Sequence, residues 1–380
     1  MMGFCLDDSQ EVLLRLLRIA IGWEESITLP ITVNWNNVVI LAEQQDVLPI
    51  MADGYELYLK NNPGAQSFLS KKENEGLKME LLSSVYMSEN NYMLHKTVLR
   101  ELSQIFNKSQ LPFLVMKGLS CGRYYPRPNH RQCGDIDIFP GDAFEESNKA
   151  LETAGVHVEP HYYRHTASII QGVTIENHRI LCDLRGPKRQ TYDFETLLKE
   201  LAKKSIENGD LFGADFPQAH FPIADFNAHF LPWHVSAHFE FERVTLRHLL
   251  DWALFLYHDR DKINLSLYKE SKKKFTYGFG PFADILTYLS VHYLNMPTDC
   301  LPIEIVEDAN SVDKELADRV LGRMFEATVP ASDSNLWRER WKLFNYVWKD
   351  GWKYRGLYGM SPIKFILYKL YGVLFRVGEE

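Results

Sequence analysis

The sequence predicts an α+β protein in which a small mixed β-sheet is flanked by N-terminal and C-terminal helical regions. Apolar residues follow a helical period through much of residues 9–106 and again from Phe194 onward. Between these regions they form short runs separated by turn residues, as strands do. With 380 residues, 46 % of them apolar, the chain can form at least two packed domains. We place the regions at 1–106, 107–190, 191–330 and 331–380.

Helices dominate the first region. Apolar residues from Val12 to Ala20 keep a helical period, and a second helix begins near Val38 and ends before Pro49. The residues Asn61-Asn62-Pro63-Gly64 form a turn, and a long amphipathic helix then covers residues 74–106.

Short strands define the second region. We expect strands at 111–116 and 135–139, a helix at 142–154 closed by Gly155, and extended runs at 161–170 and 173–184 joined as a hairpin at Gln171-Gly172. In the third region, residues 225–259 give the clearest helical pattern.

The final segment, residues 337–376, is rich in Trp, Tyr, Lys and Arg. Such a segment could make peripheral contact with a membrane surface or bind an extended polyanion. We favour the alternative, in which the aromatic side chains pack against the core while the basic side chains extend into solvent.

Composition limits the partners and the compartment. The net charge of −8 and the pI near 5.9 argue against a broad nucleic-acid interface, so long nucleic acid is not an expected partner. The five cysteines include no CxxC pair and indicate reduced thiols. The N-terminus lacks signal-peptide features, and no run of about 18 uncharged apolar residues occurs. We therefore expect a soluble, cytoplasmic protein.

The chemically most informative segment is Gly134-Asp135-Ile136-Asp137, in the second expected strand. Because side chains alternate along a strand, Asp135 and Asp137 share one face while Ile136 points to the other. Two carboxylates side by side repel each other and are costly to leave unpaired, and a divalent metal ion between them is the usual solution. This pattern predicts the start of a two-metal phosphoryl-transfer site.

A two-metal site needs a third carboxylate, for which Glu176 and Asp183 are the candidates. On an unbroken strand Glu176 shares a polar face with Thr174 and His178, whereas Asp183 lies on the other face. Asp183 reaches the site only if a bulge resets the register. We prefer Glu176.

A phosphate-binding turn is expected next to the Asp-x-Asp strand. Gly118 allows close approach of the backbone to an anion, and Ser120 offers a hydroxyl beside the amides of a helix start. Lys117 and Arg131 supply cations on either side, and Arg131 is better suited to a bidentate grip on phosphate.

Several motifs together point to one family: Met116-Lys117-Gly118, Tyr124-Tyr125-Pro126, Arg131, Gly134-Asp135-Ile136-Asp137, Ile175-Glu176-Asn177-His178, His234, His238 and the segment from Leu246 to Trp252. In these motifs the chain resembles the uncharacterised nucleotidyltransferase family of the DNA polymerase beta superfamily. The resemblance covers most of residues 35–260. One departure is Leu119, which separates the Gly and Ser that the superfamily more often shows adjacent.

The resemblance implies roles for individual residues. Asp135 and Asp137 would bind two Mg²⁺ (or Mn²⁺) ions, and Glu176 would complete the catalytic one. The nucleotide would be held by Lys117, Gly118, Ser120, Arg131, Gly134 and Arg247. The implied reaction is attack of an acceptor hydroxyl on the α-phosphorus of a nucleoside triphosphate such as ATP, with release of pyrophosphate.

Other polar groups have competing interpretations. His234 and His238 have the i, i+4 spacing of a zinc pair, but a structural or substrate-contacting role is preferred because no His-Glu-x-x-His occurs. Arg247 and Asp251 either pair on the helix surface or shape the nucleotide cleft, and we prefer the cleft. For His165 and His178, burial with hydrogen bonds is preferred over facing the metals.

The leading hypothesis is thus a metal-dependent nucleotidyltransferase whose acceptor is a small molecule, a sugar or a protein. The alternative is a catalytically silent nucleotide-binding or interaction module on the same fold.

Overall fold

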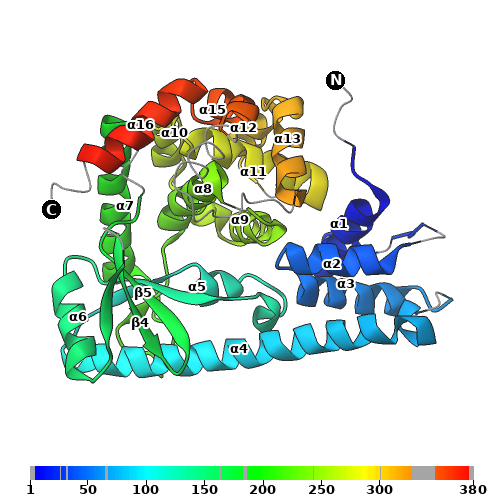
Figure 1. The fold of residues 1–380 in the computed structure, drawn as a ribbon, viewed down its shortest axis with the longest axis horizontal. Helices are drawn as coiled ribbons and strands as arrows, with labels where there is room; N and C mark the ends of the chain where they lie inside the picture. The colour runs from blue at the N-terminus through cyan, green and yellow to red at the C-terminus, as the bar shows by residue number, and fades with distance from the viewer. Residues whose placement is uncertain are drawn as a thin grey trace, which may run out of the picture.

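The computed structural model describes residues 5–25, 27–30, 33–64, 67–161, 164–182, 186–242, 244–299, 301–326 and 347–375. The fold is α+β, as predicted: one six-stranded mixed sheet is flanked by helices on both sides of it in the chain (Figure 1). The strands are β1 (Phe113–Met116), β2 (Asp135–Phe139), β3 (Val158–His161), β4 (His165–Ile170), β5 (Val173–His178) and β6 (Ala219–His220).

Most of the described chain is helical. The helices are α1 (Asp8–Ala20), α2 (Trp35–Gln44), α3 (Leu48–Asn61), α4 (Glu75–Lys108), α5 (Gly118–Gly122), α6 (Phe144–Thr153), α7 (Lys188–Asn208), α8 (Ala224–Phe241), α9 (Leu246–Asp259), α10 (Leu265–Lys274), α11 (Phe279–Leu294), α12 (Ile303–Asn310), α13 (Lys314–Phe325), α15 (Gly351–Leu357) and α16 (Pro362–Phe375). Short 3₁₀ turns occur at Phe68–Ser70, Lys72–Asn74, Pro128–His130 and Arg260–Lys262.

The sheet has the order β3-β4-β5-β2-β1-β6, so the strand that carries Asp135 and Asp137 lies near its centre. Strand β2 pairs parallel with β5 and antiparallel with β1. Strands β4 and β5 form the predicted hairpin, in which Gln171 and Gly172 both have positive φ, of 50° and 83°. Two positive φ values in a two-residue connection match the right-handed twist of the flanking strands and therefore fix the register of the hairpin.

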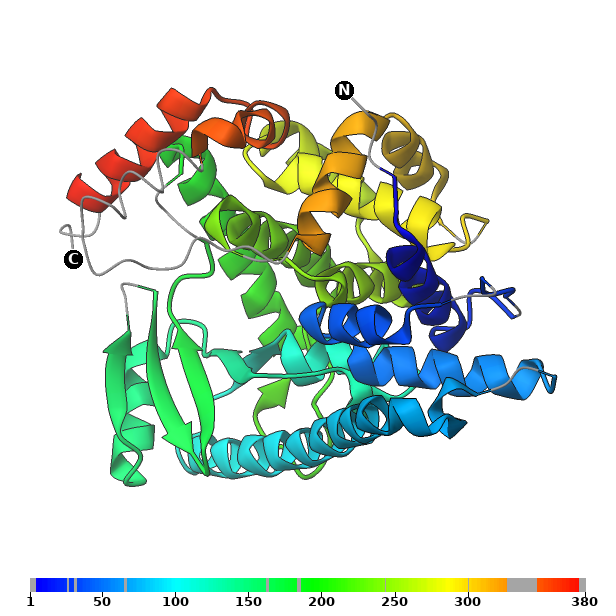
Figure 2. The ribbon, with the colours of Figure 1, turned by 45° about the vertical axis from the view of Figure 1, so that its right-hand side comes forward.

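Helix α4 packs against one face of the sheet. It was predicted within one or two residues, and both views show it running under the sheet and α5, with the bundle of α8 to α13 above (Figures 1 and 2). Its C-terminal half contributes Leu99, Leu102 and Phe106 to a core that includes Ile136 and Ile175. Since Ile136 and Ile175 point into this core, their neighbours in β2 and β5 must point to the opposite face.

Some predicted boundaries were wrong. The helical pattern of 225–259 is two helices, because Thr245 caps a new one and its backbone N–H donates to Nδ1 of His248 at 3.1 Å. The strand that begins at Val173 ends at His178 rather than continuing to residue 184. Helix α7 begins at Lys188, directly after Pro187, and not near Phe194.

The C-terminal helices pack on the second and larger core. Tyr354 and Phe365 are fully buried, and the buried ammonium of Lys353 donates to the carbonyls of Phe239 and Glu240 at 3.0 and 2.9 Å. In the same segment Leu367 is exposed. Contact of this segment with a membrane stays untested. None of the helices within the described ranges is both long and apolar enough to cross a bilayer.

Candidate metal and nucleotide site

Three carboxylates lie together on the face of the sheet opposite α4. The parallel register places Asp135 beside Thr174 and Asp137 beside Glu176. Asp135, Asp137 and Glu176 each offer an oxygen, and these oxygens all lie within 4.8 Å of one another. We call these three residues the carboxylate face. Asp183, the competing third carboxylate, lies outside the described residues.

Two basic side chains contact the carboxylate of Asp137. The Nζ of Lys117 lies 2.9 Å from Oδ1 of Asp137, and Nε2 of His178 lies 3.0 Å from the same oxygen. His178 Nε2 also lies 3.3 Å from Oε2 of Glu176. Because Asp137 is only 2 % exposed, these contacts replace the water that a carboxylate would otherwise hold.

The pKa values follow these contacts. Burial alone would raise the pKa of Asp137, but Lys117 and His178 outweigh it and hold that pKa far below its usual range. The hydrogen bond from His178 lowers the pKa of Glu176. The pKa of Asp135 is raised, first by the charge of Asp137 and then by burial. Asp135 makes no ion pair with any other described residue, so a negative charge there lacks the partners that Asp137 has.

The turn after β1 is strained where it approaches the carboxylates. Lys117 has φ 49° and ψ −139°, and Gly118 has φ 34°. A Cβ on Gly118 would meet the carbonyl oxygen of Asp135 at 3.5 Å and Sγ of Cys133 at 4.0 Å. Strained backbone of this kind costs free energy and is retained most often at functional sites. The conformation directs Lys117 toward Asp137.

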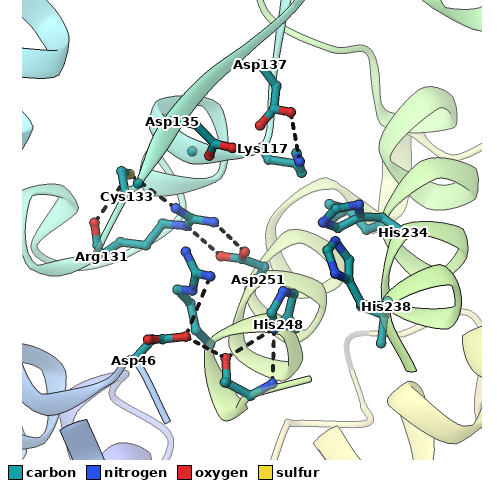
Figure 3. A pocket seen from close by; sticks show the side chains of 16 residues that line it. Asp46, Lys117, Arg131, Cys133, Asp135, Asp137, His234, His238, His248 and Asp251 are labelled. Atoms are coloured by element: carbon teal, nitrogen blue, oxygen red, sulfur yellow. Dashed lines mark hydrogen bonds and ion pairs between the residues drawn. The ribbon is translucent and has the colours of Figure 1, made fainter. Parts of the chain in front are cut away.

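A cavity of about 270 Å³ separates the carboxylate face from helices α8 and α9 (Figure 3). Seven of the nine residues predicted from the sequence as site residues line it: Lys117, Gly118, Arg131, Gly134, Asp135, Asp137 and Arg247. The other two do not. Glu176 lies beside Asp137 without lining the cavity, and Ser120 is 1 % exposed with no hydrogen-bond partner for Oγ among the described residues.

Arg131, predicted as a phosphate ligand, is held in an ion pair. Its Nε and Nη2 donate to the two oxygens of Asp251 at 2.8 and 2.6 Å, and its Nη1 donates to Cys133 Sγ at 3.2 Å. Tyr125 donates to Asp251 at 2.8 Å. The guanidinium and the carboxylate are both almost fully buried, so this pair joins the sheet region to α9 by two charge-assisted bonds.

Arg247 and Asp251 do not pair with each other. Arg247 Nη1 donates to the carbonyl of Gln132 at 3.0 Å, and Nη2 lies 3.6 Å from Oδ2 of Asp46. Both residues line the cavity, as the cleft-shaping interpretation expects. Asp46, contributed by the connection between α2 and α3, was not anticipated because nothing in the local sequence links it to residues 200 positions later.

Three histidines form the opposite wall of the cavity. His234 and His238 of α8 and His248 of α9 have ring centroids 4.3 to 6.1 Å apart, and we call them the histidine wall. Burial, with nearby cations adding to it, holds the pKa values of His234 and His248 well below their usual range. His238 Nδ1 pairs with the carboxylate of Glu242. Figure 3 shows the wall facing Asp135 and Asp137 across the cavity.

The zinc interpretation of His234 and His238 finds no support in the described part of the chain, because neither belongs to a cluster of metal-binding groups there. His229, which also lies on α8, is buried, and its Nδ1 bonds to the carbonyl of Asp225 at 2.7 Å. His178 was expected to be buried and hydrogen-bonded, and it is, but its partners are the carboxylates themselves.

The fold and the site together define an α+β protein with a three-carboxylate cluster beside a polar cavity. Comparison with known proteins is more specific. Residues 32–295 match the uncharacterised nucleotidyltransferase family, and the chain belongs to this family. No curated protein and no solved structure matched the chain.

Proposed function

We propose that this protein is a metal-dependent nucleotidyltransferase that moves a nucleoside monophosphate from a nucleoside triphosphate to an acceptor hydroxyl. The single observation that carries the proposal is the register of β2 and β5, which brings Glu176 beside Asp137 and completes the three-carboxylate cluster. Membership of the nucleotidyltransferase family supports a nucleotide as the substrate.

The residues present fit a pair of divalent cations. Asp135 has a raised pKa because its charge is next to Asp137, and a cation there would relieve that repulsion. Carboxylate oxygens are the ligands that Mg²⁺ and Mn²⁺ prefer. Asp135, Asp137 and Glu176 would hold the ions, which supply charge neutralisation at the entering and leaving oxygens.

Of the remaining residues, Lys117 and Gly118 would bind the nucleotide, whereas Arg131 and Arg247 hold the surrounding segments in place. Lys117 lines the cavity at the carboxylate face, where its ammonium can turn from Asp137 to a phosphate oxygen. Gly118 leaves the backbone open to close approach by an anion. Arg131 and Asp251 act as one rigid, nearly neutral unit that fixes α9 against the sheet. Arg247 lines the cavity and is held there by its contacts with the carbonyl of Gln132 and the carboxylate of Asp46.

The reaction consists of attack by the acceptor oxygen on the α-phosphorus and departure of pyrophosphate as the bond to the β-phosphate breaks. Most of the rate acceleration in such reactions comes from positioning and charge stabilisation rather than from a covalent intermediate. The net charge of −8 favours a small molecule, a sugar or a protein as the acceptor over long nucleic acid.

The proposal is tested by incubating the full chain with ATP, CTP, GTP or UTP, Mg²⁺ or Mn²⁺ and a cell extract that supplies acceptors. Pyrophosphate release and transfer of an α-phosphate label are measured. The wild type should release pyrophosphate, and the double variant Asp135→Asn/Asp137→Asn should not, while both give the same circular dichroism spectrum.

A matched control is Glu159→Gln, which removes a highly exposed carboxylate on the edge strand β3, separated from β5 by β4. It should keep wild-type turnover. Metal-dependent nucleotide binding without any turnover would instead support the silent nucleotide-binding module. Turnover by the double variant at the wild-type rate would refute the proposed site.

A further inference from the structure

Two histidines extend the carboxylate face along the sheet. His165 of β4 and His178 of β5 are register partners in the antiparallel hairpin, and their ring centroids are 4.8 Å apart. Glu176 stands two residues before His178 and therefore on the same face. His165, Glu176 and His178 form a second group whose potential ligand atoms all lie within 4.8 Å of one another.

Two distances in this group are close to those between the ligand atoms of a metal site. Nε2 of His165 lies 3.5 Å from Oε1 of Glu176, and Nε2 of His178 lies 3.3 Å from Oε2. Bonds of about 2.0–2.1 Å at tetrahedral angles place ligand atoms about 3.3 Å apart. The side chains are 11 %, 25 % and 7 % exposed, in sequence order, so the group is shielded but can still be reached from solvent through Glu176.

The donor set differs in kind from that of the carboxylate face. Asp135, Asp137 and Glu176 offer only oxygen, which suits Mg²⁺, whereas two imidazoles and one carboxylate suit Zn²⁺ and its transition-metal neighbours. Hence one sheet face carries two donor triads of different chemistry that share Glu176.

We propose that His165, Glu176 and His178 bind a divalent transition-metal ion, with Zn²⁺ as the ion of matching chemistry. The site shares Glu176 with the proposed nucleotidyl-transfer centre but does not depend on transfer activity. An ion there would fix the carboxylate of Glu176, which the other triad also uses.

His178 directs Nε2 toward this site. Among the described residues its polar contacts, to Asp137 and to Glu176, are made by Nε2, the atom that would bind the ion. Its Nδ1 is buried and has no hydrogen-bond partner among the described residues. Coordination through Nε2 requires the neutral ring with its proton on Nδ1, and it replaces the hydrogen bonds to the two carboxylates with metal bonds.

The experiment titrates the full-length, metal-free chain with Zn²⁺ alone, with no nucleotide, in competition with a chromophoric chelator. The wild type should bind one Zn²⁺ with an affinity at least about tenfold higher than that of His165→Gln or His178→Gln.

The chain offers a matched control, because His157 lies 3.3 Å from Glu159 in a highly exposed pair on and just before β3. His157→Gln should leave Zn²⁺ affinity unchanged. X-ray absorption at the zinc edge of the wild type should show imidazole scattering, which requires no variant to fold. A first shell of oxygen alone, or equal affinity in His165→Gln and wild type, would overturn the site. Either result leaves the nucleotidyltransferase proposal standing, because that proposal is judged by pyrophosphate release.

Discussion

The two walls of the cavity differ in the charge of their side chains and in the direction in which burial and neighbours shift their pKa values. On the carboxylate face, Asp137 is held ionised by Lys117 and His178, and Asp135 beside it carries a raised pKa. On the histidine wall, His234 and His248 are held neutral by burial and by nearby cations. The carboxylate face thus concentrates negative charge for cations, while His234 and His248 present neutral donors and acceptors on the opposite wall. A metal-bound triphosphate and an uncharged acceptor hydroxyl would suit these two surfaces respectively.

The buried pair of Arg131 and Asp251 links the two sides of the cavity. Asp251→Asn leaves the guanidinium buried without its counter-charge and should lower the free energy of unfolding by about 3–5 kcal/mol. Urea denaturation measures this loss. The exposed pair of Lys274 and Asp193 is the control: Lys274→Gln should cost less than about 1 kcal/mol. A similar small cost for Asp251→Asn would show that the walls are not joined through this pair.

The third carboxylate tests the composition of the carboxylate face. Glu176→Gln should lower the rate of pyrophosphate release by about 10²–10³, as when one electrostatic contributor to a transition state is lost. Asp183→Asn should have little effect, because the register already places Glu176 beside Asp137. Steady-state rates of the two purified variants decide between them. The reverse order of effects would assign Asp183 as the ligand.

The histidine wall predicts a dependence of stability on pH. Unfolded His takes up a proton near pH 6.5, whereas folded His234 resists protonation because burial and Lys117 lower its pKa. The free energy of unfolding should therefore fall as the pH decreases below 6.5, by at most about 1.4 kcal/mol at pH 5.5 for this residue. His234→Gln should reduce the difference in stability between pH 7.5 and 5.5. The exposed control, His157→Gln, should leave that difference as it is in the wild type.

The smallest effect is expected at Ser120. Its hydroxyl is buried, has no hydrogen-bond partner among the described residues and does not line the cavity. Removing such a group leaves nothing unpaired, so Ser120→Ala should change stability by less than about 1 kcal/mol and leave nucleotide affinity unchanged. Isothermal titration with a non-hydrolysable triphosphate checks this. A clear loss of affinity would restore Ser120 to the phosphate contact predicted from the sequence.

Local rules were enough to predict strands β1, β2, β4 and β5 and part of the site. Strand parity predicted that Asp135 and Asp137 share a face, and the structure places both on the cavity. Parity also favoured Glu176, which is the register partner of Asp137 on the neighbouring strand. The hairpin followed from Gln171-Gly172, because a tight turn between two extended runs is a local signal.

The rest depends on contacts between distant segments, which no local pattern encodes. Arg131 was predicted to grip phosphate, but Asp251, 120 residues later, neutralises it. Asp46 reaches Arg247 from the N-terminal helices in the same way. Parity alone placed His178 on the same strand face as Glu176. Its contact with Asp137 also required the order of the strands in the sheet.

The central claim is that Asp135, Asp137 and Glu176 hold the ions that bind the nucleotide. The most direct measurement is a crystal structure of the full chain with Mn²⁺ and a non-hydrolysable nucleoside triphosphate, read by anomalous scattering. The account predicts an anomalous peak bounded by oxygens of Asp135 and Asp137 and contacted by the triphosphate, with Glu176 ligating at least one ion. A triphosphate bound in the cavity with no manganese at these carboxylates would contradict it.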